Sequence, residues 1–346
     1  MKLIVFLPLL ACLIAFVCDM LLIAHAHKWK LIDSPNHRSS HHVPTPSGGG
    51  IGLVVAGSLT GLLLVWQSSW FFGGAVLVVS CVLAGVGLRD DRQPMPATYR
   101  LGIQAVMGAC LLLVLGGMPE LQHFSNAWLS RTLIYLFLLL VIVWWINLFN
   151  FMDGIDGIAG SQVVFMLLAA ATLLVWSRPS VVASPALIWM LCIAGATIGF
   201  LILNWAPAKI FMGDVGSIYL AFMVLSLGLL SIRNDWIPVV AGLAMWSILG
   251  AAFVSDATVT LVTRMVTGKR WYEAHRSHAY QRLARKFGHH RPVTLMYMAV
   301  NVLWLLPLAA ACVAWPQWAL AWACLAYVPL LLAAIRLGAG KVDSLN

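Results

Sequence analysis

The stretch Thr132–Phe149 reads TLIYLFLLLVIVWWINLF and contains no charged residue. A helix needs about 20 apolar residues to cross a bilayer core about 30 Å thick, so this run predicts a membrane-spanning helix. Across all 346 residues, 62% are apolar and 10% are charged, whereas soluble domains have roughly 25% charged residues. This composition excludes a soluble globular enzyme, because the chain has too few polar residues to cover a surface that faces water.

Similar apolar runs recur along the whole chain, and about 10 or 11 of them are long enough to span a bilayer. No internal repeat or long linker separates the runs, so we expect a single all-α, polytopic membrane domain over residues 1–346. The runs are Leu3–Ala24, Gly50–Trp66, Phe71–Leu88, Leu101–Gly116, Thr132–Phe149, Ile158–Trp176, Ala186–Leu203, Val215–Ser231, Ile237–Val262, Val293–Val313 and Ala319–Ile335.

The basic residues gather in alternate loops between these runs. When alternate loops are assigned to opposite sides, most of the 21 Lys and Arg residues fall on one side, many of them between Arg264 and Arg291. Cytoplasmic loops carry the excess of Lys and Arg, so this side is predicted to be cytoplasmic, with the N-terminus outside and the C-terminus inside. The net charge of +9 therefore reflects topology and does not indicate a nucleic-acid partner.

Five of the twelve acidic residues, all aspartates, fall in three predicted cytoplasmic segments that are otherwise poor in charge: Asp90, Asp91, Asp153, Asp156 and Asp214. Short carboxylates beside glycines suit Mg²⁺, which proteins hold with one or two carboxylates together with substrate phosphates. The adjacent pair Asp90–Asp91 is by itself explained equally well by an Asp–Arg network at a helix end.

The second acidic segment is the most informative. Asn147, Asn150, Asp153 and Asp156 recur at every third position, which places successive members near one another on a helical path. A stripe of small residues for helix packing does not require two Asp and two Asn. Ionisable groups at membrane depth are costly, so this segment predicts a functional site.

The third segment places Lys209, Gly213, Asp214 and Ser217 around the start of the next apolar run. Free backbone amides at a helix start are suited to bind a phosphate, and Asp214 is suited to hold the metal of that phosphate. Ser217 is also compatible with a helix N-cap.

Two basic loops complete the candidate site. His275, Arg276 and His278 form a cluster of donors for an anion such as a pyrophosphate, and Arg38 and His41 stand in another loop on the same side. A solvated positive-inside face is the alternative interpretation of the histidine loop, and a plain connector is the alternative for the loop of Arg38 and His41.

In this order, the segments resemble the polyprenyl-phosphate N-acetylhexosamine-1-phosphate transferase superfamily, glycosyl transferase family 4. The resemblance extends from Asp33 to Gln281 and rests on Asp90–Asp91, on the Asn-x-x-Asn-x-x-Asp-Gly-x-Asp-Gly element at 147–157, on Phe-Met-Gly-Asp-x-Gly-Ser at 211–217, and on the histidine loop. The form of this loop is similar to that of the branch that initiates O-antigen and lipopolysaccharide synthesis. Missing family features, a Lys soon after the Asp pair and three consecutive histidines, argue against the enzyme of the peptidoglycan precursor.

The resemblance implies a multi-pass enzyme of the bacterial inner membrane with a periplasmic N-terminus and a cytoplasmic C-terminus. Its active site would be formed by cytoplasmic loops 27–49, 89–100, 150–162, 204–217 and 263–292. The implied reaction moves an N-acetylhexosamine-1-phosphate from a UDP-sugar to undecaprenyl phosphate and releases UMP. Mg²⁺ is the implied cofactor, with Mn²⁺ as a substitute, and a homodimer is compatible with the family.

The resemblance also implies roles for individual residues. Asp90, Asp91 and Asp214 are expected to be catalytic, with Asp214 and Asp91 as metal ligands and Asp90 nearest the acceptor phosphate. A proton-accepting role for Asp90 is doubtful, because a phosphate monoester with a second pKa of about 6 is already largely dianionic near neutral pH. The expected substrate-binding residues are Asn147, Asn150, Asp153, Asp156, Lys209, Gly213, Ser217, His275, Arg276, His278, Arg38 and His41.

Two other functions remain as alternatives. A secondary transporter would place acids near the bilayer midplane on broken helices, usually in paired halves, whereas these acids crowd one surface. A CDP-alcohol phosphotransferase would need an Ala-Arg after the Asp-Gly of residues 153–154 and two further Asp residues, which residues 158–162 do not supply.

Overall fold

The computed structural model describes residues 2–29, 31–33, 43–116, 128–269 and 275–341. Helices make up 82% of it and strands 1%, which confirms the all-α prediction. Within the described ranges, ten helices are long and apolar enough to cross a membrane, and a bent helix pair raises the number to eleven. Both counts agree with the number of spans predicted from the apolar runs.

The helices follow one another along the chain. They are α1 (Lys2–Trp29), α2 (Gly50–Ser68), α3 (Phe71–Arg92), α4 (Ala97–Val114), α5 (Trp128–Phe151), α6 (Ile158–Ser177), α7 (Pro185–Asn204), α8 (Gly213–Arg233), α9 (Val239–Leu249), α10 (Ala251–Val266), α11 (Ala279–Phe287), α12 (His290–Val300), α13 (Leu306–Ala314) and α14 (Ala319–Arg336). Short helical turns lie at Pro179–Ala183, Asn301–Leu305 and Pro316–Trp318, and strands β1 (Ile32–Asp33) and β2 (Thr45–Pro46) form an antiparallel pair.

Helix α8 is the innermost element of the bundle. In its most apolar 18-residue window, 94% of the residues are buried inside the protein, against 17% for the span that contains α14. A helix that is apolar on all sides and buried on all sides belongs to the centre of a bundle. The first turn of α8, which carries Asp214, therefore lies among the ends of neighbouring helices.

The ninth apolar run is not one straight helix, as the sequence suggested, but the pair α9 and α10, which are bent by 72° at Gly250. The bend leaves the carbonyl of Leu249 available, and the side-chain amide of Gln162 donates to it at 2.8 Å. Gln162 in turn accepts a hydrogen bond from Asn301 at 2.7 Å. A side chain that satisfies the interrupted backbone is a usual cause of a sharp kink.

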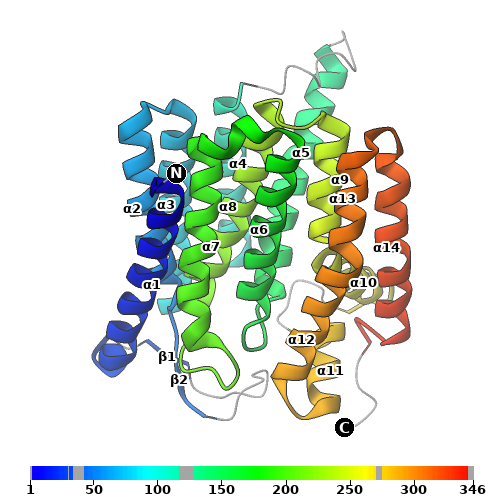
Figure 1. Ribbon diagram of the computed structural model, residues 1–346. Coiled ribbons are helices and arrows are strands. Elements are labelled where there is room, and N and C mark those ends of the chain that lie inside the picture. The colour runs from blue at the N-terminus through cyan, green and yellow to red at the C-terminus, as the bar shows by residue number, and fades with distance from the viewer. Residues whose placement is uncertain (1, 30, 34–42, 117–127, 270–274, 342–346) are drawn as a thin grey trace.

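The predicted site residues that the structure describes lie at one end of the bundle. In Figure 1 this is the lower end, where β1, β2, α11 and the C-terminus are found. The N-terminal end of α1 lies toward the opposite end (Figure 1). The fold therefore gathers segments that are far apart in the sequence, from α3 to α12, at a single surface.

Candidate functional site

The Asp90 carboxylate lies at the end of α3 and is held from two sides. Its Oδ1 accepts a hydrogen bond from the backbone amide of Met95 at 2.6 Å. Its Oδ2 accepts one from Nη1 of Arg100, in the first turn of α4, at 2.5 Å. The short turn between α3 and α4 thus fixes an ion pair whose Asp90 side chain is buried.

Arg100 links the first and third acidic segments. The same Nη1 atom lies 3.2 Å from Oδ2 of Asp214, so one guanidinium group bridges two carboxylates from helices α3 and α8. Arg100 is not among the site residues predicted from the sequence. Its position in the sequence did not indicate a contact with the aspartates, because the contact depends on the turn at residues 93–96, which brings Arg100 close to Asp90.

Asp91 caps the N-terminal end of α8. Its two carboxylate oxygens accept hydrogen bonds from the backbone amides of Asp214 at 2.7 Å and Val215 at 3.0 Å. A negative charge at a helix N-terminus satisfies amides that have no partner within the helix. The expectation that these amides are free to bind phosphate is therefore wrong for Asp214 and Val215.

The close approach of Asp91 requires a glycine at position 213. Gly213 has a φ of +72°, and a Cβ there would lie 2.7 Å from Oδ2 of Asp91. Any side chain would be strained in this backbone conformation and would displace the carboxylate. Gly213 thus acts on the geometry of the site, and the residue before α8 is Met212, so Ser217 is not its N-cap.

Asn150 joins the second acidic segment to the third. Its amide Nδ2 donates to Asp214 Oδ1 and to Ser217 Oγ, both at 2.8 Å. Asn147, one turn earlier on α5, donates instead to Gln104 Oε1 on α4 at 2.6 Å. The structure therefore brings Asn150 and Ser217 to Asp214, whereas Asn147 ties α5 to α4.

Of the five predicted site aspartates, Asp153 has the least support from its surroundings. It lies half-buried between α5 and α6, and its carboxylate makes no hydrogen bond with the residues that the structure describes. Burial, followed by the neighbouring carboxylates Asp91 and Asp156, raises the pKa of Asp153 to about 7. A carboxylate in this setting favours a proton or a cation.

Asp156 is engaged by the protein. Its Oδ2 accepts from the amide of Ala208 at 3.0 Å, and its Oδ1 lies 3.1 Å from Nδ1 of His290. Asp156 therefore connects the α5–α6 turn to the α7–α8 loop and to α12. Lys209, in the same α7–α8 loop, is exposed, and its ammonium group has no partner within the described ranges.

The histidine loop lies beside the α5–α6 turn. The rings of His275 and His278 stack with their centroids 5.0 Å apart, and Nδ1 of His275 lies 3.2 Å from Oγ of Ser277. Burial, followed by the charges of His278 and Arg264, lowers the pKa of His275 to about 3. His275 is thus a neutral imidazole near pH 7 and offers one N–H donor, while Arg276 is exposed.

Asp256 of α10 attaches this loop to the bundle. Its oxygens accept from the amides of Ala279 at 2.8 Å and Tyr280 at 3.0 Å, which open α11. The hydroxyl of Tyr280 donates to the carbonyl of Phe151 at 2.9 Å. A Cβ at Gly154 would lie 2.2 Å from that hydroxyl, so glycine is needed next to Asp153 for the two loops to meet.

The site combines five aspartates with one guanidinium bound directly to two of them. Within the described ranges there is no group of three or more His, Cys, Asp or Glu arranged to hold a metal ion. The donors still fit Mg²⁺, which commonly takes one or two carboxylates and completes its shell with water and substrate phosphates. Asp214 and the unsupported Asp153 are the carboxylates best suited to that role, and Arg38 and His41 lie outside the described residues.

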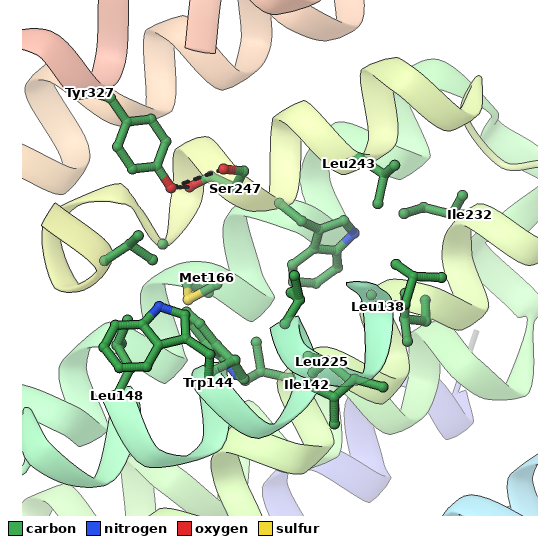
Figure 2. Close-up of a pocket in the computed structure, with 18 residues that line it drawn as sticks. Leu138, Ile142, Trp144, Leu148, Met166, Leu225, Ile232, Leu243, Ser247 and Tyr327 are labelled. Atoms are coloured by element: carbon green, nitrogen blue, oxygen red, sulfur yellow. Dashed lines mark hydrogen bonds between the residues drawn. The ribbon is translucent and has the colours of Figure 1, made fainter. Parts of the chain in front are cut away.

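An apolar cavity of about 320 Å³ lies within the membrane-spanning part of the bundle, and its α8 wall, from Val224 to Ile232, lies deeper in the membrane than Asp214. Its α5 wall runs from Leu138 to Leu148, which is two residues before Asn150. Figure 2 shows the α5 side chains on one side and Tyr327 with Ser247 on the other. Because its lining comes from helices α5, α6, α8, α9, α10 and α14, the sequence pattern held no signal for it.

The sequence of this chain is similar to one protein family and to several known enzymes. The model of glycosyl transferase family 4 matches residues 74–232. A probable undecaprenyl-phosphate N-acetylglucosaminyl 1-phosphate transferase of Bacillus subtilis is 27% identical over 279 residues, which cover 77% of this chain and 74% of the relative. A phospho-N-acetylmuramoyl-pentapeptide-transferase of Mycobacterium tuberculosis is 30% identical over 280 residues, which cover 67% of this chain and 75% of the relative.

Proposed function

The chain belongs to glycosyl transferase family 4, the superfamily of polyprenyl-phosphate hexosamine-1-phosphate transferases, and we propose that it transfers an N-acetylhexosamine-1-phosphate from a UDP-sugar to undecaprenyl phosphate. The reaction forms a bond between an acceptor phosphate oxygen and the sugar-bearing phosphorus. The bond from that phosphorus to the bridging oxygen breaks, and UMP leaves with the electron pair.

The observation that carries the proposal is the position of the carboxylate cluster. Asp90, Asp214 and Arg100 meet at one end of a membrane bundle, and an apolar cavity within the membrane-spanning part extends along α5 as far as Leu148. A transferase that joins a soluble nucleotide-sugar to a lipid needs a polar site open to water and an apolar site within the membrane. The cavity is suited to part of the hydrocarbon chain of the acceptor.

The acidic residues and Asn150 are assigned to metal binding and to the support of the metal ligands. Asp214 and Asp153 would hold the Mg²⁺, and Asn150 fixes the Asp214 carboxylate through its 2.8 Å hydrogen bond. When bound, the metal neutralises charge that develops on the leaving UMP, which is the main demand of phosphoryl transfer. Asp91 fixes the start of α8 and so the position of Asp214.

Arg100 is placed to receive the acceptor phosphate. Its guanidinium spans Asp90 and Asp214, and a planar group with several N–H donors binds phosphate oxygens well. Asp90 orients Arg100 through the 2.5 Å contact. The acceptor phosphate needs no base, because it is already largely dianionic near neutral pH.

The donor determines the orientation in the membrane. Nucleotide-sugars are soluble and cytoplasmic, so we place the site end of the bundle in the cytoplasm of a bacterial inner membrane, with loops 27–49, 89–100, 150–162, 204–217 and 263–292 on that side. The N-terminus is then periplasmic and the C-terminus cytoplasmic. The excess of Lys and Arg in these loops supports this orientation.

The glycan that the enzyme initiates is proposed to be O-antigen, lipopolysaccharide or a related envelope polymer. The form of the histidine loop supports this assignment. The 30% identity to phospho-N-acetylmuramoyl-pentapeptide-transferases makes the peptide-bearing precursor the second candidate donor. Both candidates share the same reaction and the same leaving group.

The test is release of UMP by the purified protein in detergent. The protein is incubated with undecaprenyl phosphate, Mg²⁺ and, in turn, UDP-N-acetylglucosamine, other UDP-N-acetylhexosamines and UDP-N-acetylmuramoyl-pentapeptide. UMP formed only when both lipid phosphate and metal are present supports the proposal and identifies the sugar. Failure of all these donors to yield UMP, with a protein that remains folded, contradicts it.

A further inference from the structure

The chain continues past α14 into five residues, Leu337–Lys341, that fold back onto the histidine loop and are called the C-terminal strap here. The strap leaves α14 through Gly338 and Gly340, which have φ values of +74° and +82°. Its amide at Ala339 donates to the carbonyl of Ala334 at 3.1 Å, and Ala339 itself is buried. The lower end of α14 lies next to α10 and α11 in Figure 1.

The strap contacts the histidine loop directly. The amide of Gly340 donates to the carbonyl of Ser277 at 2.8 Å. The hydroxyl of the same Ser277 lies 3.2 Å from Nδ1 of His275. Ser277 therefore connects the strap on one side with the imidazole of His275 on the other.

Arg282 of α11 holds the strap at both of its ends. Its Nε donates to the carbonyl of Leu337 at 2.9 Å, and its Nη1 donates to the carbonyl of Lys341 at 3.1 Å. Two hydrogen bonds from one planar guanidinium fix the orientation of a segment as well as its position. The strap and α11 thus form one unit.

The packing at Gly340 leaves no room for a side chain. A Cβ at this position would lie 2.6 Å from Cβ of Thr263 and 2.7 Å from the carbonyl of Thr260, both on α10. Thr260 in turn donates to Asp256 at 3.2 Å, the residue that accepts the first amides of α11. The strap is therefore wedged between the helix that supports the histidine loop and the loop itself.

We propose that the C-terminal strap is a positioning element of the active site, which holds His275 through Ser277 in the place where it meets the nucleotide-sugar donor. The inference rests on the proposed function, and it adds the segment after the last membrane span to the donor side of the site. The acceptor side, formed by Asp90 and Arg100, has no contact with the strap. Loss of the strap is thus expected to act on the donor alone.

Two variants detach the strap by different means. Gly340→Ala places a methyl group where only hydrogen fits, and a stop after Arg336 removes the strap entirely. Both are expected to raise the KM for UDP-N-acetylglucosamine, or for the donor identified by UMP release, by about tenfold, the effect of losing one or two well-formed hydrogen bonds. The KM for undecaprenyl phosphate should stay within about twofold of the wild-type value, because the acceptor residues are untouched.

Gly288→Ala is the matched control. Gly288 also has a positive φ, of +72°, but a Cβ there meets nothing within 4 Å, and it ends α11 on the side away from the strap. It introduces the same backbone strain without a clash. Its donor KM should equal that of the wild type.

Hydrogen exchange separates this inference from the proposed function. In the truncated protein, peptides covering 275–281 should exchange faster than in the wild type, and those covering 209–217 should not change. This result supports the strap even if the wild type accepts none of the donors. Unchanged exchange at 275–281, or equal rises in the donor and acceptor KM values, overturns the proposal.

Discussion

The junction of α3 with α8 and the junction of α10 with α11 are built on the same principle. They differ in the number of carboxylates that are not used to cap the second helix. At each junction an aspartate on a membrane helix, Asp91 or Asp256, accepts hydrogen bonds from two backbone amides in the first turn of another helix. Asp256 is further satisfied by the hydroxyl of Tyr297 at 2.7 Å. Among the residues that the structure describes, the first junction differs in having two additional carboxylates, Asp90 and Asp214, bridged by one guanidinium beside its capping residue.

The difference separates structural acids from chemical ones. A buried carboxylate whose oxygens all accept hydrogen bonds has a structural role, which here is to hold two helices together. Asp90 and Asp214 share one guanidinium, and Asp153 has no hydrogen-bonded donor among the described residues. Adjacent carboxylates repel one another, so the surplus negative charge at this helix start favours a bound cation. An enzyme that transfers phosphate groups can use such a cation.

The difference between the two junctions is tested most strongly by neutralising one acid at each of them. Asp214→Asn removes the charge of the proposed metal ligand, so UMP release should fall by about 10³-fold, the size seen when a key electrostatic group is lost. The detergent-solubilised protein should melt at the wild-type temperature. Full activity in this variant would contradict the assignment of Asp214.

Arg100→Gln tests the bridge between the two surplus acids. Loss of the guanidinium leaves the acceptor phosphate without its proposed partner, and we expect turnover to fall by about 10²-fold. Arg100→Lys should recover part of this loss, because a point charge reaches one acid but does not bridge two. Equal rates for the wild type and Arg100→Gln would show that the bridge is only structural.

Asp256→Asn is the corresponding change at the second junction. The Asn amide presents an N–H group where a backbone amide now donates, so the free energy of unfolding should fall by about 2 to 4 kcal/mol. Turnover per folded molecule should fall by no more than about tenfold. A thermal melt followed by an activity assay measures both effects, and a large loss of turnover without a change in stability would remove the distinction between the junctions.

The pH dependence of kcat/KM tests whether Asp153 belongs with the surplus acids. Because its pKa is raised to about 7, Asp153 is neutral below that pH and charged above it. If the charged form helps to hold the metal, activity should fall as the pH drops through about 7. Asp153→Asn should lower the plateau and remove this acid limb, whereas an unchanged profile in the variant would exclude Asp153.

The smallest effect is expected at the bend between α9 and α10. Gln162→Leu removes the amide that donates to Leu249, so the cavity wall should loosen and the KM for undecaprenyl phosphate should rise by a few fold, about the effect of one hydrogen bond. The donor KM should not change. Thr172→Ala on the same helix is the control, because Thr172 bonds only to its own helix.

The sequence predicted the helices and the three acidic segments because both signals are local. Apolar length decides whether a helix crosses a bilayer, and the third-residue spacing of Asn147, Asn150, Asp153 and Asp156 is visible without a structure. The number of spans was confirmed with the bent pair included. The family was also recognised from these motifs and is shown by the relatives.

Within the three acidic segments, the sequence did not predict which acids are used in packing. Asp91 and Asp214 look alike in the sequence, yet Asp91 accepts the amides of α8 and Asp214 does not. Arg100, the bend at Gly250 and the strap all depend on contacts between distant segments. Tertiary hydrogen bonds of this kind leave no periodic pattern in the chain.

The most direct test of the distinction between the two junctions is metal binding itself. Mn²⁺ is titrated into the purified protein with UDP-N-acetylglucosamine present, and the free ion is followed by electron paramagnetic resonance. We predict that the wild type and Asp256→Asn bind the ion, and that Asp214→Asn does not. Equal binding by Asp214→Asn and the wild type would contradict the claim that the surplus acids at the start of α8 hold the metal.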